Sequence, residues 1–132
     1  MVVGTGIDIV EIERIRAAKE RWGERFLSRV FTRLERAHCA RRKEEDSSLA
    51  ARFAAKEAVA KALGLGLGRF AWQEIEVVTL DTGRPLVRMT GLTLAAAQVQ
   101  GVGRVLLSLS HTRQYAVAQA VALSVAEQKN RP

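Results

Sequence analysis

The sequence contains one cysteine, Cys39, and aromatic residues make up only 5% of its 132 positions. A lone cysteine excludes a disulfide within the chain and makes a zinc site built from cysteines unfavourable. So few aromatic rings predict an aliphatic core and offer no platform on which nucleic-acid bases could stack. Neither end carries a secretory signal, and no apolar run could span a membrane. These absences predict a cytoplasmic protein.

Positive charge exceeds negative charge, with 21 lysines and arginines against 14 acidic residues and a net charge of +7. This excess favours an acidic partner, which could be nucleic acid, an anionic membrane surface, an acidic protein or a polyphosphate. A hydrophobic content of 48% and a charged content of 27% are ordinary for a globular protein. The length predicts one domain, which we place at residues 1–126, followed by a frayed tail at 127–132.

Hydrophobic periodicity predicts both strands and helices. The expected strands cover residues 2–10, 72–80, 86–89, 105–110 and 115–125, and the expected helices cover 11–22, 32–40, 48–63 and 92–100. Thr32 and Glu35 have the spacing of a capping box, and Ser47 or Ser48 is expected to cap the long helix. The charged run 41–46 between these two helices is expected to be a loop.

Glu57 is an unusual residue because it stands in an alanine-rich segment, 51–64, where a small apolar side chain would be easier to bury. Lys61 follows one helical turn later on the same face. The spacing alone favours a solvated pair of Glu57 with Lys61 or Lys56. Alternatively, either lysine could neutralise a phosphate, and Lys61 could also donate a proton to a leaving phosphate.

Asp8 is the odd residue in an aliphatic strand that also contains Gly4 and Gly6, where backbone or a ligand could approach closely. Asp8 and Glu57 are candidate metal ligands, because magnesium takes carboxylate oxygens and shares its other positions with waters and phosphates. The alternative for Asp8 is that it caps the helix that follows.

The alternate glycines Gly64, Gly66 and Gly68 come after a helix instead of before one. The helix dipole would therefore oppose an anion at this loop, and a plain helix terminator is favoured over a phosphate cradle.

The chain has two histidines. His111 follows Ser110 at the end of an apolar strand, where both side chains could donate hydrogen bonds to a phosphate or could simply lie in a turn. A catalytic Ser110–His111 pair is less attractive, because neighbours along a strand point to opposite faces. His38 is expected to be an ordinary helix residue.

Basic residues recur along the first helix and just beyond it, and they suggest a docking face for an acidic partner. The candidates are Arg14, Arg16, Lys19, Arg21 and Arg25, with Ile15 and Trp22 as apolar contacts. Because glutamates are interleaved with them, an ordinary solvated face is the alternative.

Four ordered motifs resemble the holo-[acyl-carrier-protein] synthases, the small phosphopantetheinyl transferases, over almost the whole chain. The motifs are Gly6-Ile7-Asp8 with Arg14, Arg52-Phe53-Ala54-Ala55-Lys56-Glu57-Ala58 with Lys61, Gly83-Arg84-Pro85, and Ser108-Leu109-Ser110-His111-Thr112. The resemblance implies an α+β fold, with a mainly antiparallel sheet packed against a long helix, and a homotrimer with sites at subunit interfaces.

The resemblance also implies an activity, which is the transfer of 4′-phosphopantetheine from coenzyme A to a serine of apo-acyl carrier protein. Adenosine 3′,5′-bisphosphate is released, the product serves fatty acid biosynthesis, and magnesium, with manganese as an alternative, is required. Nucleic acid and membranes are then not partners. A basic module that binds nucleic acid or an acidic protein without catalysis is the alternative reading.

Residue roles follow from the same resemblance. Asp8 and Glu57 would hold the metal, a metal-bound water or Glu57 would deprotonate the serine, and Lys61 would stabilise or protonate the leaving phosphate. The implied contacts of coenzyme A are Lys61, Arg52, Gly64, Arg84, Pro85, Ser110 and His111, the last reaching a molecule bound mainly by the adjacent subunit. Arg14, Arg21 and Arg25 would meet the carrier protein. From charge alone, Arg41, Arg42 or Lys43 could bind the 3′-phosphate.

Overall fold

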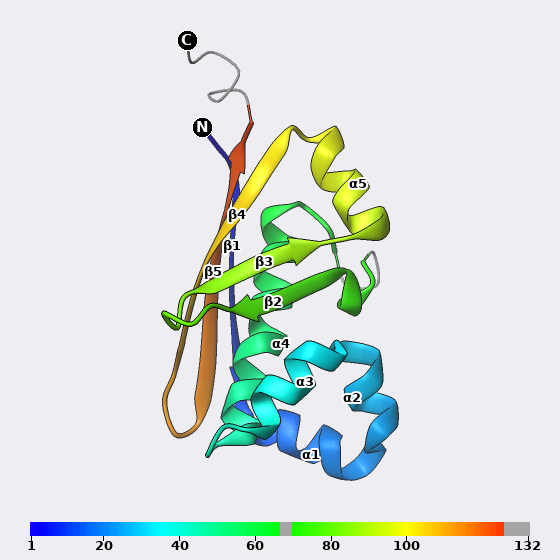
Figure 1. Cartoon of the computed structure of the whole chain (residues 1–132), viewed down its shortest axis with the longest axis vertical. Helices are drawn as coiled ribbons and strands as arrows, with labels where there is room; N and C mark the ends of the chain where they lie inside the picture. Colours follow the sequence, from blue (N-terminus) through cyan, green and yellow to red (C-terminus); the bar gives the residue numbers. More distant parts are fainter. Residues whose placement is uncertain (67–69, 126–132) are drawn as a thin grey trace.

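The computed structural model describes residues 1–66 and 70–125 (Figure 1). The strands are β1 (Val2–Glu11), β2 (Ile75–Thr79), β3 (Pro85–Met89), β4 (Val102–His111) and β5 (Tyr115–Ser124). The helices are α1 (Ile12–Trp22), α2 (Glu24–Val30), α3 (Arg33–Ala40), α4 (Glu45–Ala62) and α5 (Gly91–Val99), with one 3-10 turn, η1 (Trp72–Glu74). The tail expected at 127–132 and the glycine at position 68 lie outside the described residues.

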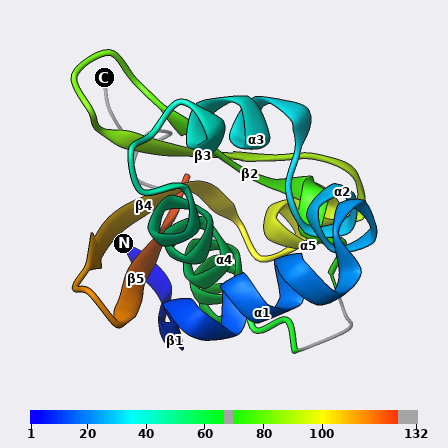
Figure 2. The same cartoon turned by 90° about the horizontal axis from the view of Figure 1, so that it is seen from below.

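Two antiparallel sheets enclose the long helix α4. One has the strand order β1-β5-β4, and the other is the β2-β3 hairpin. Viewed nearly along its axis, α4 lies between the three-stranded sheet and the hairpin, with α1 and α3 beside it (Figure 2). This arrangement confirms the expected α+β fold with a mainly antiparallel sheet on a long helix. None of the helices in the described ranges is long and apolar enough to cross a membrane.

Strand β1 rests directly on the backbone of α4. A Cβ atom at Gly4 would overlap the carbonyl oxygen of Ala62, and one at Gly6 would overlap the carbonyl oxygen of Ala58. Both alanines are buried, so no side-chain layer separates the strand from the helix. The two glycines therefore serve the approach of backbone, which was one of the two alternatives for them.

Helix α4 begins earlier than the sequence predicts. Its first residue is Glu45 and its N-cap is Glu44, which makes no capping hydrogen bond with its side chain. The expected caps, Ser47 and Ser48, therefore lie inside the helix, and only residues 41–44 of the charged run form the connection. Acidic side chains in the first turn interact favourably with the helix dipole, which explains why this charged segment can begin a helix.

Three further features of the secondary structure were predicted wrongly: one missed helix and the starts of two strands. The seven-residue helix α2 was missed, although Gly23 does end α1 as expected, with φ of 53°. Residues 72–74 form η1 instead of the start of a strand, and β4 begins at Val102 instead of 105. A helix of two turns has too few residues to show a periodic pattern, so tertiary packing decides its existence.

A buried ion pair joins α3 to α4. The Lys56 ammonium lies 2.7 Å from Glu35 Oε1, and both side chains are fully buried. Lys56 Nζ also donates to the carbonyl oxygens of Trp72 and Ile75, while Glu35 accepts from the backbone N–H groups of Thr32 and Val77. Burial lowers the pKa of Lys56, and Glu35 partly opposes that shift. Lys56 is therefore a structural residue that can neither reach a phosphate nor pair with Glu57.

Candidate active site

The inner face of β1 brings Asp8 to the C-terminal end of α4. Lys61 Nζ donates to Asp8 Oδ1 at 3.1 Å and to the carbonyl oxygen of Ile7 at 2.9 Å. The Lys61 side chain is half-exposed, so its charge remains accessible to a ligand. The close contact at Gly6 permits this meeting, since any larger residue would lift Asp8 away from the helix. The alternative role for Asp8, capping α1, is wrong, because Glu11 occupies the N-cap.

Glu57 lies beside this pair and shares its electrostatic field. Burial raises the pKa of Glu57, the negative charge of Asp8 raises it further, and Lys61 and Arg14 oppose both effects. Lys61 bonds to Asp8 instead of forming the solvated pair with Glu57 that spacing alone favoured. A carboxyl group with a raised pKa in partly buried surroundings is typical of general acid–base sites.

Within the described part of the chain, no group of three or more histidine, cysteine, aspartate or glutamate side chains could hold a metal ion. A metal at Asp8 and Glu57 would therefore have two protein carboxylates and take its other ligands from water and substrate. That donor set suits magnesium, which binds through one or two carboxylates and substrate phosphates. The residues present fit such an ion.

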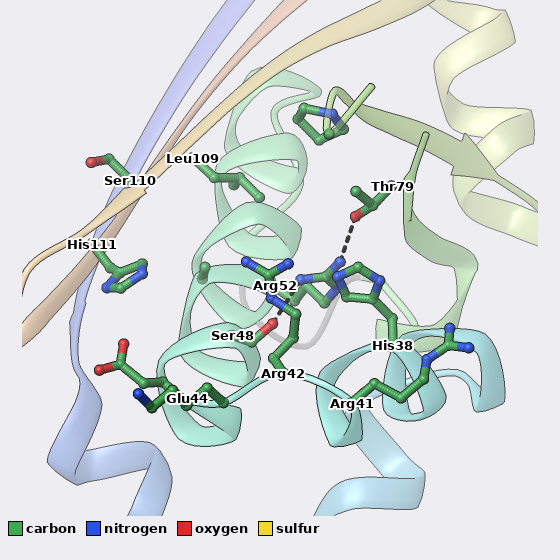
Figure 3. A pocket seen from close by; sticks show the side chains of 14 residues that line it. His38, Arg41, Arg42, Glu44, Ser48, Arg52, Thr79, Leu109, Ser110 and His111 are labelled. Carbon is green, nitrogen blue, oxygen red and sulfur yellow. Dashed lines mark hydrogen bonds between the residues drawn. The ribbon is translucent and has the colours of Figure 1, made fainter. Parts of the chain in front are cut away.

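A cationic cavity of about 660 Å³ opens on the other side of α4. Its wall is formed by α3 and the connection after it, the first half of α4, the turn of the hairpin and the end of β4 (Figure 3). The lining residues are His38, Arg41, Arg42, Lys43, Glu44, Ser48, Ala51, Arg52, Thr79, Gly83, Pro85, Leu109, Ser110 and His111. Four permanent cations face one carboxylate in this list, so the cavity suits an anion.

The structure gathers some of the predicted coenzyme A contacts here and leaves others out. Arg52, Pro85, Ser110 and His111 all line the cavity, whereas Arg84, although between two lining residues, does not. Arg41, Arg42 and Lys43, suggested only from charge, do line it.

Arg52 forms a buried cationic part of the cavity wall. Its side chain donates from Nη1 to Ser48 Oγ at 3.2 Å and from Nη2 to Thr79 Oγ1 at 2.6 Å. Its Nε is buried and has no hydrogen-bond partner among the described residues. The guanidinium is therefore fixed in place by two hydroxyls, neither of which the sequence had marked as functional.

His38 also lines the cavity, although the sequence suggested no role for it. Burial lowers the pKa of His38, and the charges of Arg52, Arg42 and Arg41 lower it further. The missed signal was spacing: Arg41 and Arg42 follow His38 by three and four residues, which places all three on one side of a helix end.

Gly64 ends α4 and lies outside the cavity. It has φ of 71°, and the N–H of Leu65 donates to the carbonyl oxygen of Ala60 at 2.8 Å. This left-handed termination confirms the favoured reading of Gly64 as a helix terminator.

The carboxylate cluster adjoins one edge strand of the three-stranded sheet, β1, and the cavity adjoins the other edge strand, β4. Asp8 on β1 is level with Ala118 on β5, and Ala118 is level with Leu109 on β4. Since neighbouring strands are about 4.8 Å apart, β1 and β4 are separated by roughly 10 Å. Asp8, Glu57 and Lys61 are absent from the cavity wall. The carboxylate cluster and the cavity are therefore separate groups of residues within the described part of the chain.

The basic residues around α1 divide into two sets. Arg16 bonds to Asp46 at 3.0 Å, and Lys19 bonds to Asp46 at 2.6 Å, so both tie α1 to the start of α4. Arg21 and Arg25 instead lie over the half-exposed ring of Trp22, at 4.9 and 5.8 Å from its centroid. The second set, which like Arg14 is exposed, is the one available to a partner. The expectation that Ile15 offers an apolar contact is wrong, because its side chain is buried in the core.

Comparison with known proteins identifies the class. Residues 4–120 match the family model described as the 4′-phosphopantetheinyl transferase superfamily, and the chain belongs to that superfamily. More particularly, it is 51% identical over 120 residues to a holo-[acyl-carrier-protein] synthase of Chlamydia trachomatis serovar D, covering 90% of this chain and 98% of that one. The resemblance seen in the four motifs is thus confirmed.

Solved structures agree with this assignment. Holo-[acyl-carrier-protein] synthase from Neisseria meningitidis matches with a TM-score of 0.86 and 33% identity, covering 94% of this chain and 100% of that chain. The Helicobacter pylori protein of the same name, solved in complex with coenzyme A, matches with a TM-score of 0.80 and 30% identity. That match covers 90% of this chain and 99% of the other.

The charge of Asp8 is expected to set part of the pKa of Glu57. In metal-free protein, Asp8→Asn should lower the pKa of Glu57, because a neighbouring negative charge is removed. Carbon NMR of the side-chain carboxyls, followed against pH, measures this directly. Asp81→Asn, in the hairpin turn, is the control and should leave Glu57 unchanged. An identical Glu57 titration in wild type and Asp8→Asn would contradict the coupling.

Proposed function

We propose that this chain is a holo-[acyl-carrier-protein] synthase that transfers 4′-phosphopantetheine from coenzyme A to a serine of apo-acyl carrier protein, for fatty acid biosynthesis. The serine oxygen forms a bond to the phosphorus that carries pantetheine, and the bond from that phosphorus to the leaving phosphate breaks. Adenosine 3′,5′-bisphosphate is the second product. The main structural support is the cluster of Asp8, Glu57 and Lys61, in a chain whose relatives carry this name.

Three side chains carry the chemistry in this proposal. Asp8 and Glu57 would hold magnesium, or manganese in its place, and the ion would supply positive charge against the diphosphate. Glu57 also accepts the proton of the attacking serine. Lys61, half-exposed and held by Asp8, donates a proton or hydrogen bond to the leaving phosphate. Phosphoryl transfer depends mainly on such alignment and charge neutralisation.

The cationic cavity binds the nucleotide end of coenzyme A. Arg52 and His111 contact phosphate there, and Ser110 and Pro85 contribute to the wall. Arg41, Arg42 and Lys43 add three charges for the 3′-phosphate. A relative solved in complex with coenzyme A supports the choice of ligand. Arg84, exposed beside the cavity, and Gly64, at the end of the Lys61 helix, complete the proposed contacts.

The two halves of the site meet in a homotrimer. The outer face of the three-stranded sheet supports assembly, since Ile7 and Ile9 are 62% and 65% exposed there. Ile9 is level with Val117 on β5, and exposed Leu106 extends the apolar face onto β4. Exposed aliphatic side chains on one face of a sheet are typical of an interface. In the assembly, Asp8 and Glu57 of one subunit face the His111 side of its neighbour, and one molecule of coenzyme A spans both.

The transferase activity is tested by incubating apo-acyl carrier protein with coenzyme A, magnesium and the protein, then weighing the intact carrier. Wild type should add one phosphopantetheine. Glu57→Gln and Lys61→Met should each slow the addition by at least about 100-fold, because a proton-transfer group is lost. Glu20→Gln, at an exposed glutamate of α1, is the control. An unmodified carrier after incubation with the wild-type protein would refute the transferase activity. That result is the one expected from a basic binding module without catalysis.

The carrier protein docks on the free basic residues of α1 and α2. Because Arg14 acts on Glu57 electrostatically, this face adjoins the carboxylates. Arg14→Glu, and the same change at Arg21 or Arg25, should raise KM for the carrier by about tenfold, or ~1.4 kcal/mol, without changing KM for coenzyme A. Arg104→Glu, at the other end of the sheet, should change neither. Equal effects on both substrates would contradict a docking face.

Subunit mixing tests the shared site. Asp8→Asn and His111→Ala should each be nearly inactive as pure proteins, since each spoils one half of every site. After dissociation and reassembly together, random trimers should combine intact halves in about a quarter of the sites, because each site takes one half from each of two neighbours. The measurement is transferase activity before and after mixing, with light scattering to confirm three subunits. No recovery of activity in mixed trimers would place both halves within one subunit.

A further inference from the structure

His38 occupies a position in the cavity that neither the motifs nor the proposed reaction uses. Its imidazole extends from the last turn of α3 toward Arg52 on α4 (Figure 3). The cavity is wide enough for a phosphorylated ligand, and His38 is one of only two histidines in the chain. The other, His111, stands across the cavity at the end of β4 (Figure 3).

The charges that face His38 are nearly all positive. Arg41, Arg42 and Lys43 follow it along the chain, Arg52 faces it from α4, and His111 faces it from β4. Glu44 is the one carboxylate among the residues that line the described cavity. Burial and then the three arginines lower the pKa of His38 in this ligand-free state. A neutral imidazole is therefore the favoured form near pH 7 when the cavity holds no anion.

A bound phosphate reverses the sign of this field. A phosphate monoester brings about 1.5 to 2 negative charges and three acceptor oxygens. Beside such a group, an imidazolium gains a charge-assisted hydrogen bond that a neutral ring cannot match. The same arginines that disfavour the proton on His38 are then neutralised.

We propose that His38 is a phosphate-binding residue of this cavity and that it takes up a proton when the nucleotide end of coenzyme A binds. The inference rests on the proposed function for its ligand, but not on the chemistry of transfer. It gives the cavity a pH-dependent contact that is separate from Asp8, Glu57 and Lys61. Nucleotide affinity is thereby linked to proton concentration near neutrality.

The direction of the pH dependence follows from linkage. The bound state has the higher pKa at His38, so the contribution of His38 to binding is complete below the pKa of the free protein. It is lost as pH rises through the higher pKa of the complex. The ligand's own phosphate acts in the opposite sense, because its second pKa is about 6 and its dianion binds better. Only a comparison of variants separates the two.

The first measurement follows the imidazole protons of both histidines by NMR against pH, with and without adenosine 3′,5′-bisphosphate. The spectrum of His111→Gln assigns the two signals. The pKa of His38 should rise when the nucleotide is added and should not change when uncharged adenosine is added. If the nucleotide binds while the His38 titration stays in place, the inference is overturned. If the nucleotide does not bind at all, the proposed function fails first, so the two failures are distinguishable.

The second measurement is calorimetric affinity for the same nucleotide in variants. His38→Gln, which is neutral, should weaken binding by about tenfold at pH 6 and by little at pH 8.5, since one pKa unit corresponds to a factor of ten. His38→Arg, which stays charged, should retain affinity at pH 8.5. Arg33 lies on the same helix but lines a different pocket. Arg33→Gln therefore removes a charge without altering this cavity, and its affinity for the nucleotide should match that of wild type at both pH values. Equal losses for His38→Gln at both pH values would refute proton uptake.

Discussion

The contact between the backbones of β1 and α4 is the constraint on which the rest of the structure depends. Gly4 and Gly6 leave no Cβ between the strand and the carbonyl oxygens of Ala62 and Ala58. The site exists because this contact is so close: Lys61 can reach both the side chain of Asp8 and the backbone of β1. Small residues on both partners are therefore part of the site's geometry, even though none of them touches a substrate in the proposed reaction.

Helix α4 places three cationic residues in three different environments. Arg52 is held by hydroxyls at a cavity, Lys56 is sealed in the core against Glu35, and Lys61 remains half-exposed beside Asp8. Removing a partner from the buried pair would leave an uncompensated charge, which typically costs about 3–5 kcal/mol. The pair also joins α3, η1 and β2 to the middle of α4, one residue before Glu57. A single helix thus organises the core, the cationic wall of the cavity and the carboxylate cluster.

Much of the fold and part of the site could be predicted from the sequence. The strands and the long helix showed clear periodicity, and Glu57 stood out because it interrupts a run of small residues. The predictions that failed concern contacts between segments far apart in the sequence, which local patterns do not reveal. Nothing local to Lys56 indicates that Glu35 neutralises it, and nothing local to His38 indicates that Arg52 lies opposite. The start of α4 was predicted wrongly for a similar reason, because Asp46 is held by Arg16 and Lys19 from another helix.

The missing side-chain layer between β1 and α4 also bears on motion. A helix that touches a strand through bare backbone can neither rotate nor slide by one residue without steric overlap, so β1 and α4 move as one rigid body. Asp8, Glu57 and Lys61 all belong to that body. The opposite wall of the cavity is built from the 41–44 connection and the hairpin turn, which have no such lock. Any change in the width of the cavity is therefore expected at that wall, while the carboxylate cluster keeps its shape.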